Sequence, residues 1–128
     1  MVMRRLGVFL LSLAGLGCGL LDSTDSFVIR VDSISAPASI ALADTLTARF
    51  FGSVGSDGCS RLERVEKRRD EGLIELRFHG TRKGGVDCIQ MPVSLDHEER
   101  IVPPLPDPFT IRVLQPDGAP LERVVGVQ

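Results

Sequence analysis

The chain has 128 residues, with 15 basic and 17 acidic side chains, a formal net charge of −2, and no Trp or Tyr. This mild acidity gives no electrostatic footprint for nucleic acid, and the lack of Trp and Tyr argues against stacking on single-stranded bases. The length suits one small domain.

The first segment has the pattern of an export signal. Arg4 and Arg5 precede an uncharged run from Leu6 to Leu21, and small residues surround Cys18. The 12 apolar and small residues before Cys18 would span roughly 18 Å as a helix, against about 30 Å of bilayer hydrocarbon. A cleaved signal is therefore favoured over its alternative, a permanent spanning helix.

These residues resemble a bacterial lipoprotein signal. In that family the signal is removed before a cysteine, whose sulfur and new amino terminus are then acylated. The match consists of Leu16, Gly17 and Cys18, whereas Gly15 stands where the family prefers leucine; export without a lipid is the alternative. The resemblance implies a signal peptide at residues 1–17, lipidation at Cys18, and a membrane-anchored protein on the periplasmic or surface side of the bacterial cell envelope.

The cysteine count fits a lipid on Cys18. An exported domain with three cysteines must account for the unpaired one. If Cys18 carries lipid, Cys59 and Cys88 remain to form one disulfide, with buried thiols as the alternative.

Removal of the signal also changes the net charge. Arg4 and Arg5 are lost with it, so 13 of the 15 basic residues remain against 17 acidic ones, and the formal charge becomes −4.

After a short tether at residues 18–26, alternating apolar and polar residues predict strands. The four clearest segments are "FVIRVDS", "DTLTARFFGSV", "GLIELRFHG" and "VDCIQMPVSL". Between them, "APASIALAD" reads as a connection with at most a short edge segment, and "GSDG" as a turn. The predicted inward residues are Phe27, Ile29 and Val31; Leu46, Ala48 and Phe50; Ile74, Leu76 and Phe78; and Ile89, Met91, Val93 and Leu95.

The charged segment at residues 60–71 is open to two interpretations. Ser60 with Glu63 fits a helix capping box, and the glycine that follows the segment fits a helix stop. Only Leu62 and Val65 are available for an apolar stripe, however, which is too little to pack a helix. We favour a charged edge strand, whose charges would keep it from pairing with other chains.

The rest of the chain completes an all-β pattern. "TRKGG" reads as a loop, "EERIVPP" as one more short strand, and "PPLPDP" as a stiff crossing. "FTIRVLQ" and "LERVVGVQ" flank the turn sequence "PDGAP" and predict a hairpin. About seven or eight short strands over residues 27–128 predict a single β-sandwich, similar in architecture to the immunoglobulin-like domains of bacterial surfaces.

No residue set in the chain matches a known catalytic or metal-binding pattern. His79 and His97 are the only histidines, and a zinc site combining them with Asp96 or Glu98 lacks convergent spacing. No G-x-S-x-G elbow is present. "GTRKGG" lacks the spacing of a phosphate loop, and "PPLPDP" reads as a stiff connection rather than a polyproline ligand. We therefore expect no cofactor and no metal.

These observations predict a non-catalytic envelope lipoprotein: a membrane-tethered β-sandwich that binds or braces another component, with an envelope protein as candidate partner and no nucleic acid. One alternative is an envelope enzyme or enzyme inhibitor whose site includes His79, Arg82 and Asp87. Another is an assembly accessory that pairs an edge strand with a partner chain.

Overall fold

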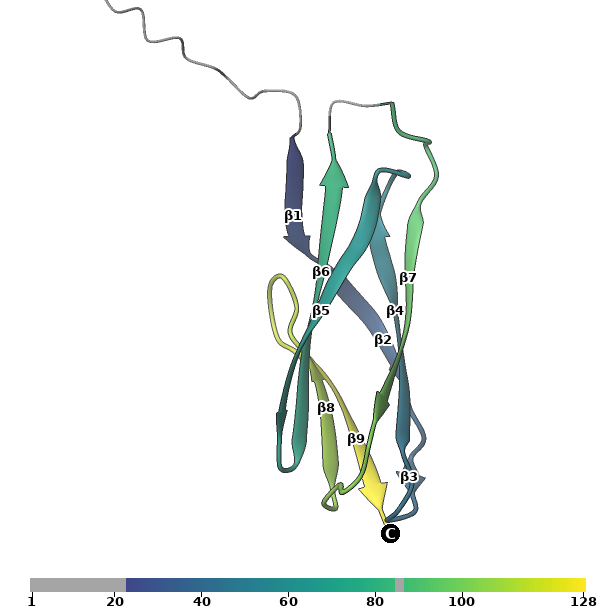
Figure 1. Cartoon of the computed structure of the whole chain (residues 1–128), viewed down its shortest axis with the longest axis vertical. Helices are drawn as coiled ribbons and strands as arrows, with labels where there is room; N and C mark the ends of the chain where they lie inside the picture. Colours follow the sequence, from purple (N-terminus) through teal and green to yellow (C-terminus); the bar gives the residue numbers. More distant parts are fainter. Residues whose placement is uncertain (1–22, 85–86) are drawn as a thin grey trace, which may run out of the picture.

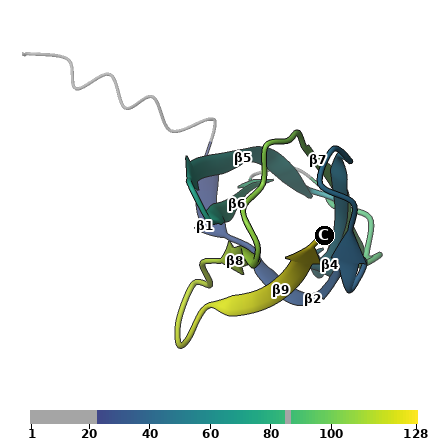
Figure 2. The ribbon, with the colours of Figure 1, turned by 90° about the horizontal axis from the view of Figure 1, so that it is seen from below.

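A computed structural model describes residues 23–84 and 87–128 (Figure 1). Nine strands in these ranges form a mixed six-stranded sheet and a three-stranded sheet that enclose one core (Figure 2), so the predicted all-β sandwich is confirmed. No helix in the described residues is long and apolar enough to cross a membrane. The strands are β1 (Thr24–Val28), β2 (Arg30–Ser35), β3 (Ser39–Ile40), β4 (Leu46–Gly55), β5 (Ser60–Asp70), β6 (Leu73–Lys83), β7 (Val93–Ile101), β8 (Phe109–Val113) and β9 (Leu121–Val127).

The long strand β6 is the central strand of the larger sheet and pairs with three others. β5 runs antiparallel along one edge of β6, from Ser60 opposite Arg82 to Asp70 opposite Leu73. The other edge is shared, because β1 pairs antiparallel with the second half of β6 and β8 pairs parallel with the first half. β9 pairs with β8, and the short β3 adds to β9 in parallel. The sequence pattern did not indicate these two parallel pairings.

The chain changes sheets at Ile29. β1 lies in the six-stranded sheet, whereas β2 pairs with β4 in the three-stranded sheet, whose other edge is β7. Ile29 is buried between the layers, and its N–H donates to the carbonyl of Phe78 at 2.8 Å. The segment predicted as one strand is therefore two short strands in different sheets, although Ile29 and Val31 are buried as predicted.

One apolar core fills the space between the sheets. Its centre is aromatic: the ring centroids of Phe50 on β4 and Phe78 on β6 lie 5.2 Å apart in a tilted contact, and Phe109 on β8 is fully buried beside other core residues. The alternation predicted for β4 and β6 is confirmed. The buried residues of these two strands include Leu46, Ala48 and Phe50, and Ile74, Leu76 and Phe78.

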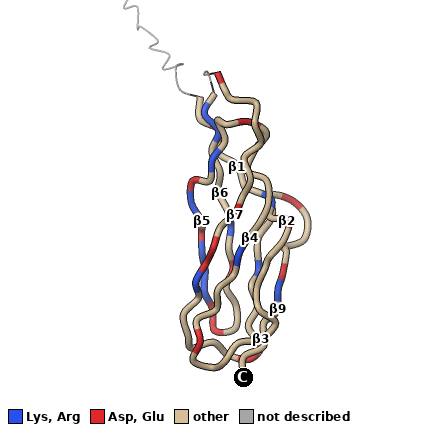
Figure 3. The backbone as a smooth tube through the Cα atoms, turned by 90° about the vertical axis from the view of Figure 1, so that its right-hand side faces the viewer, with Lys and Arg blue, Asp and Glu red and all other residues tan. Residues whose placement is uncertain are grey.

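The charged segment forms the edge strand β5, so the strand interpretation is confirmed. Leu62 and Val65 pack partly buried against the core, while most of the other side chains are exposed. Figure 3 shows the run of charged positions along β5. Among the described strands β5 pairs only with β6, and a bulge between Leu62 and Arg64 interrupts that pairing. Charges and a bulge on an edge strand both discourage pairing with another chain.

Two further predictions are confirmed at the ends of the fold. β8 and β9 pair antiparallel as the predicted hairpin. Gly118 in its connection has a φ of 74°, in the left-handed region that glycine adopts without a Cβ penalty. β3 matches the short edge segment expected within "APASIALAD".

The strand predicted over "VDCIQMPVSL" is wrong in its first half. Residues 87–92 form no strand, and the predicted inward residues Ile89 and Met91 are 74% and 64% exposed. The disulfide between Cys88 and Cys59 explains the difference, because it ties this segment to the connection between β4 and β5.

Three strand boundaries also differ from the predictions. β7 runs without interruption from Val93 to Ile101, so "EERIVPP" contributes the end of this strand rather than a separate one. Thr81 to Lys83 belong to β6 and not to a loop, because β1 and β5 both pair with them. β1 begins at Thr24, within the segment predicted as tether.

Candidate functional site

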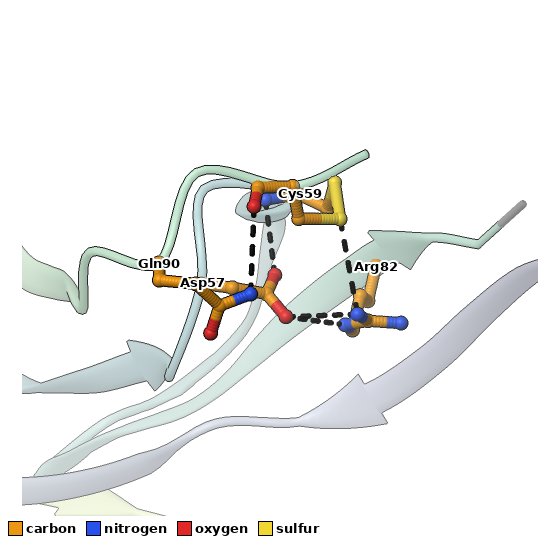
Figure 4. Close-up of a disulfide and its surroundings, with 5 residues drawn as sticks. Asp57, Cys59, Arg82 and Gln90 are labelled. Atoms are coloured by element: carbon orange, nitrogen blue, oxygen red, sulfur yellow. Dashed lines mark hydrogen bonds and ion pairs between the residues drawn. A yellow bond between two sulfur atoms is a disulfide. The ribbon is translucent and has the colours of Figure 1, made fainter. Parts of the chain in front are cut away.

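The disulfide lies at the end of the sandwich where β1 begins. It joins Cys59, just before β5, to Cys88 in the loop after β6. Their Cα atoms are 5.4 Å apart, inside the limit of about 7 Å for a bridge. The bond links two strand connections, the one between β4 and β5 and the one between β6 and β7. Figure 4 shows it beside Asp57 and Arg82.

Asp57 and Arg82 form an ion pair next to this bridge. Two nitrogens of the Arg82 guanidinium donate to Oδ2 of Asp57 at 3.1 and 2.8 Å, and the N–H of Cys59 donates to Oδ1 at 3.1 Å. The hydrogen bond from Arg82 and the one from Cys59 together hold the pKa of the buried Asp57 carboxyl below its usual value, against the opposing effect of burial. The same contact raises the pKa of Arg82. The pair therefore clamps the turn before β5 onto the end of β6.

A metal site at this position does not fit the chemistry of the donors. One potential ligand atom from each of Asp57, Cys59 and Cys88 lies within 4.8 Å of the others. Both sulfurs are bonded to each other, however, whereas metals bind the thiolate form of cysteine. The carboxylate already accepts from Arg82. In the oxidised protein this cluster is a structural clamp.

Two of the three residues singled out for a catalytic alternative, His79 and Arg82, make separate contacts. His79 and Arg82 stand three positions apart on the regularly paired β6, which places them about 10 Å apart on opposite faces. The Nε2 atom of His79 lies 2.8 Å from a carboxylate oxygen of Glu66 on β5, and this contact lowers the pKa of Glu66. Asp87 is exposed in the loop after β6.

A second polar cluster bridges the two sheets between β5 and β7. Glu99 on β7 accepts a hydrogen bond from Nζ of Lys67 on β5 at 2.7 Å, and its other oxygen lies 3.0 Å from Nε2 of His97. The ring of His97 also meets the edge of Phe78, with centroids 5.5 Å apart. Partial burial opposes the charged form of Glu99, but the hydrogen bonds from Lys67 and His97 outweigh it and lower the pKa. This cluster joins the edges of the two sheets by side chains.

The carboxylate that contacts His97 is Glu99, which is not among the ligands weighed from the sequence. Of the two that are, Asp96 and Glu98, Asp96 pairs with Arg49 on β4 through two hydrogen bonds of 2.8 and 2.9 Å. Alternation along β7 places residue 99, and not residue 96 or 98, on the same face as His97. Strand alternation alone therefore indicates Glu99 as the partner of His97.

At the opposite end of the sandwich, Arg69 of β5 holds the proline-rich connection. Its guanidinium donates to the carbonyls of Val102 and Pro104 at 2.7 and 3.0 Å, and Leu105 of this connection is buried in the core. Beside these contacts lies an open hollow of about 510 Å³. It is lined by Arg69, Asp70, Glu71, Pro104, Leu105 and Pro106. We call this region, defined by those six residues, the distal hollow.

The predicted lipidation site, Cys18, lies outside the described residues, and so does the signal-like segment at residues 1–17. Gly85 of the "GTRKGG" segment is also outside them.

Comparison of the chain with protein-family models found no match, and comparisons with curated proteins and with solved structures found none either.

Proposed function

We propose that this protein is a non-catalytic lipoprotein of the bacterial cell envelope, anchored through a lipid on Cys18. Its β-sandwich serves as a tethered binding or structural module. The observation that carries the proposal is the pairing of cysteines: Cys59 and Cys88 bond to each other within the domain. Of the three cysteines in the chain, this leaves Cys18, six residues before β1, for another role.

The contacts of the titratable groups support a non-catalytic role. His79 pairs with Glu66, and Asp57 pairs with Arg82. Glu99 joins Lys67 to His97. Each of these groups connects one strand or turn to another and so contributes to holding the fold. A catalytic acid or base needs a perturbed group that is available to a substrate in a cavity. Glu66, Lys67 and Glu99 do line shallow hollows, but each already pairs with a protein partner.

The distal hollow is the best candidate for contact with another envelope component. It lies at the end of the sandwich away from the start of β1 (Figure 1), so an anchored domain would present it away from the lipid. Pro104 and Pro106 supply apolar surface, and Arg69, Asp70 and Glu71 supply charges of both signs. Such a mixture is typical of protein-binding surfaces.

The charged edge of β5 argues against strand pairing at that edge. Strand addition needs an accessible edge whose backbone groups can pair with a partner. The Lys67–Glu99 ion pair and the contacts of Arg69 with the proline-rich connection cross from β5 to β7 and the segment after it. A partner strand would have to displace these side chains.

Metabolic labelling with a fatty acid in a bacterial host tests the anchor. We expect label on the wild-type protein and in the membrane fraction, and loss of both in Cys18→Ser. The matched control is Cys59→Ser/Cys88→Ser, which removes the other two thiols and should keep the label. Label that survives Cys18→Ser, or that disappears in the control, would reject the proposal.

A further inference from the structure

At the end of the sandwich where β1 begins, backbone hydrogen bonds join four segments of the chain. The N–H of Gly84 donates to the carbonyl of Ser23 at 2.7 Å, and the N–H of Gly58 donates to the carbonyl of Ile89 at 2.8 Å. We call this end, made of Ser23, the turn at 56–59, Gly84 and the loop at 87–92, the proximal end. It is at the top of Figure 1.

Two large apolar side chains are held in solvent at the proximal end. Ile89 is 74% and Met91 is 64% exposed. The loop that carries them is fixed at several points: Cys88 is bonded to Cys59, the carbonyl of Ile89 accepts from Gly58, and the N–H of Met91 also donates to that carbonyl at 2.8 Å. The fold therefore presents these two side chains to solvent from an anchored loop, and Ile89 is the most exposed of the large apolar residues that the structure describes.

The length of chain before β1 keeps the proximal end close to Cys18. Thr24 comes six positions after Cys18, and six residue steps at full extension reach about 20 Å. β6 has 11 residues and spans about 37 Å, close to the length of the sandwich. A lipid on Cys18 would thus keep the proximal end near the bilayer, while the other end lies beyond the reach of the tether.

We propose that Ile89 and Met91 insert into the interfacial region of the bilayer that holds the lipid anchor. This inference rests on the proposed lipidation of Cys18. The inserted side chains give the domain a second point of contact with the membrane. The domain is therefore oriented with its proximal end against the bilayer. The distal hollow then faces away from the membrane, toward a partner.

The contact is apolar rather than electrostatic. The exposed charges at and beside the proximal end have both signs in equal number: Arg61 and Lys83 with Asp25 and Asp87. Arg82 is neutralised by Asp57. Membrane contact that depends on basic residues weakens with salt. Insertion of Ile89 and Met91 is expected to be insensitive to it.

The chain has no Trp, so a single introduced indole reports its own surroundings. The full-length lipoprotein is reconstituted into phosphatidylcholine–phosphatidylglycerol liposomes whose acyl chains carry bromine, a fluorescence quencher. Met91→Trp places the indole at the proximal end. The matched control is Leu42→Trp. In the wild type the Leu42 side chain is 65% exposed. This residue lies at the opposite end of the sandwich, where its N–H donates to the carbonyl of Gln128.

We expect the indole at position 91 to emit at shorter wavelength and to be quenched several-fold more than the one at position 42, at both low and high salt. Adding Ile89→Ser to Met91→Trp should reduce the quenching. Adding Val124→Ser, which changes an exposed apolar residue on β9, should not.

Two outcomes would overturn the inference, and they are distinguishable. If the protein floats with the liposomes but the indole at position 91 is not quenched, the anchor stands and the insertion is refuted. A blue shift without quenching belongs to this case and would mean that a protein, such as a second copy of the chain, covers the loop. If the protein does not float, the lipid anchor itself fails and the inference fails with it.

Discussion

Removal of the disulfide is the most direct perturbation of the proximal end. Cys59 and Cys88 are 29 residues apart in the chain, and their bond closes a loop of that size. In the chain-entropy model this closure stabilises the folded state by about 3–4 kcal/mol. For a domain of roughly 100 residues, that loss lowers the melting temperature by about 15 °C. We therefore expect Cys59→Ala/Cys88→Ala to fold but to unfold at a much lower temperature.

The comparison is made in a Cys18→Ser background, which excludes lipid and any third thiol. Because the chain lacks Trp and Tyr, unfolding is followed by far-ultraviolet circular dichroism in urea and on heating. Cys18→Ser alone is the control. A loss of stability below about 1 kcal/mol would refute the reasoning, because the bond would then not constrain the unfolded chain as the model requires.

Three further predictions concern the core, a tight backbone approach and an ion pair. Phe78→Ala should lower the free energy of unfolding by about 3–5 kcal/mol in urea titrations, since this ring is fully buried; a loss below about 1 kcal/mol would contradict its central position. Gly52→Ala should cost about 1–3 kcal/mol in the same assay, because a Cβ at this position would lie 2.4 Å from the carbonyl oxygen of Arg30; unchanged stability would show that β2 and β4 do not approach so closely. The Arg82 contact keeps the pKa of Asp57 below its usual value of 3.8, so the unfolded state binds the proton more readily. The stabilisation is complete above the unfolded-state pKa and is lost as the pH falls through the folded-state value. Stability measured from pH 6 to pH 2 should therefore fall less steeply in Asp57→Asn than in the wild type, and parallel curves would contradict this assignment.

The strands with clear alternation of apolar and polar residues were predictable from the sequence, because burial of one face against a core determines that pattern. β4 and β6 bury every second residue, as the sequence pattern requires for strands with one face on a core. The loop at 87–92 has the same apolar alternation, yet Ile89 and Met91 are exposed. Periodicity reports which side chains share a face. It does not report whether that face meets a core, and here the bond to Cys59 determines the path of the chain.

Contacts between distant segments were the least predictable part of the candidate site. Asp57 was identified only as part of a turn sequence, because nothing local to it indicates that Arg82, 25 positions later, donates to its carboxylate. Arg69 likewise belonged to an undifferentiated charged run until the structure placed the carbonyls of Val102 and Pro104 beside it.

The measurement that tests the central claim most directly is mass spectrometry of the N-terminal tryptic peptide of the protein purified from bacterial membranes. The account predicts a peptide that starts at Cys18, ends at Arg30, and is heavier than its amino-acid sequence by the mass of a diacylglycerol group on sulfur and an acyl group on the amine. A peptide with an unmodified Cys18, or a mature protein that retains residues 1–17, would contradict it.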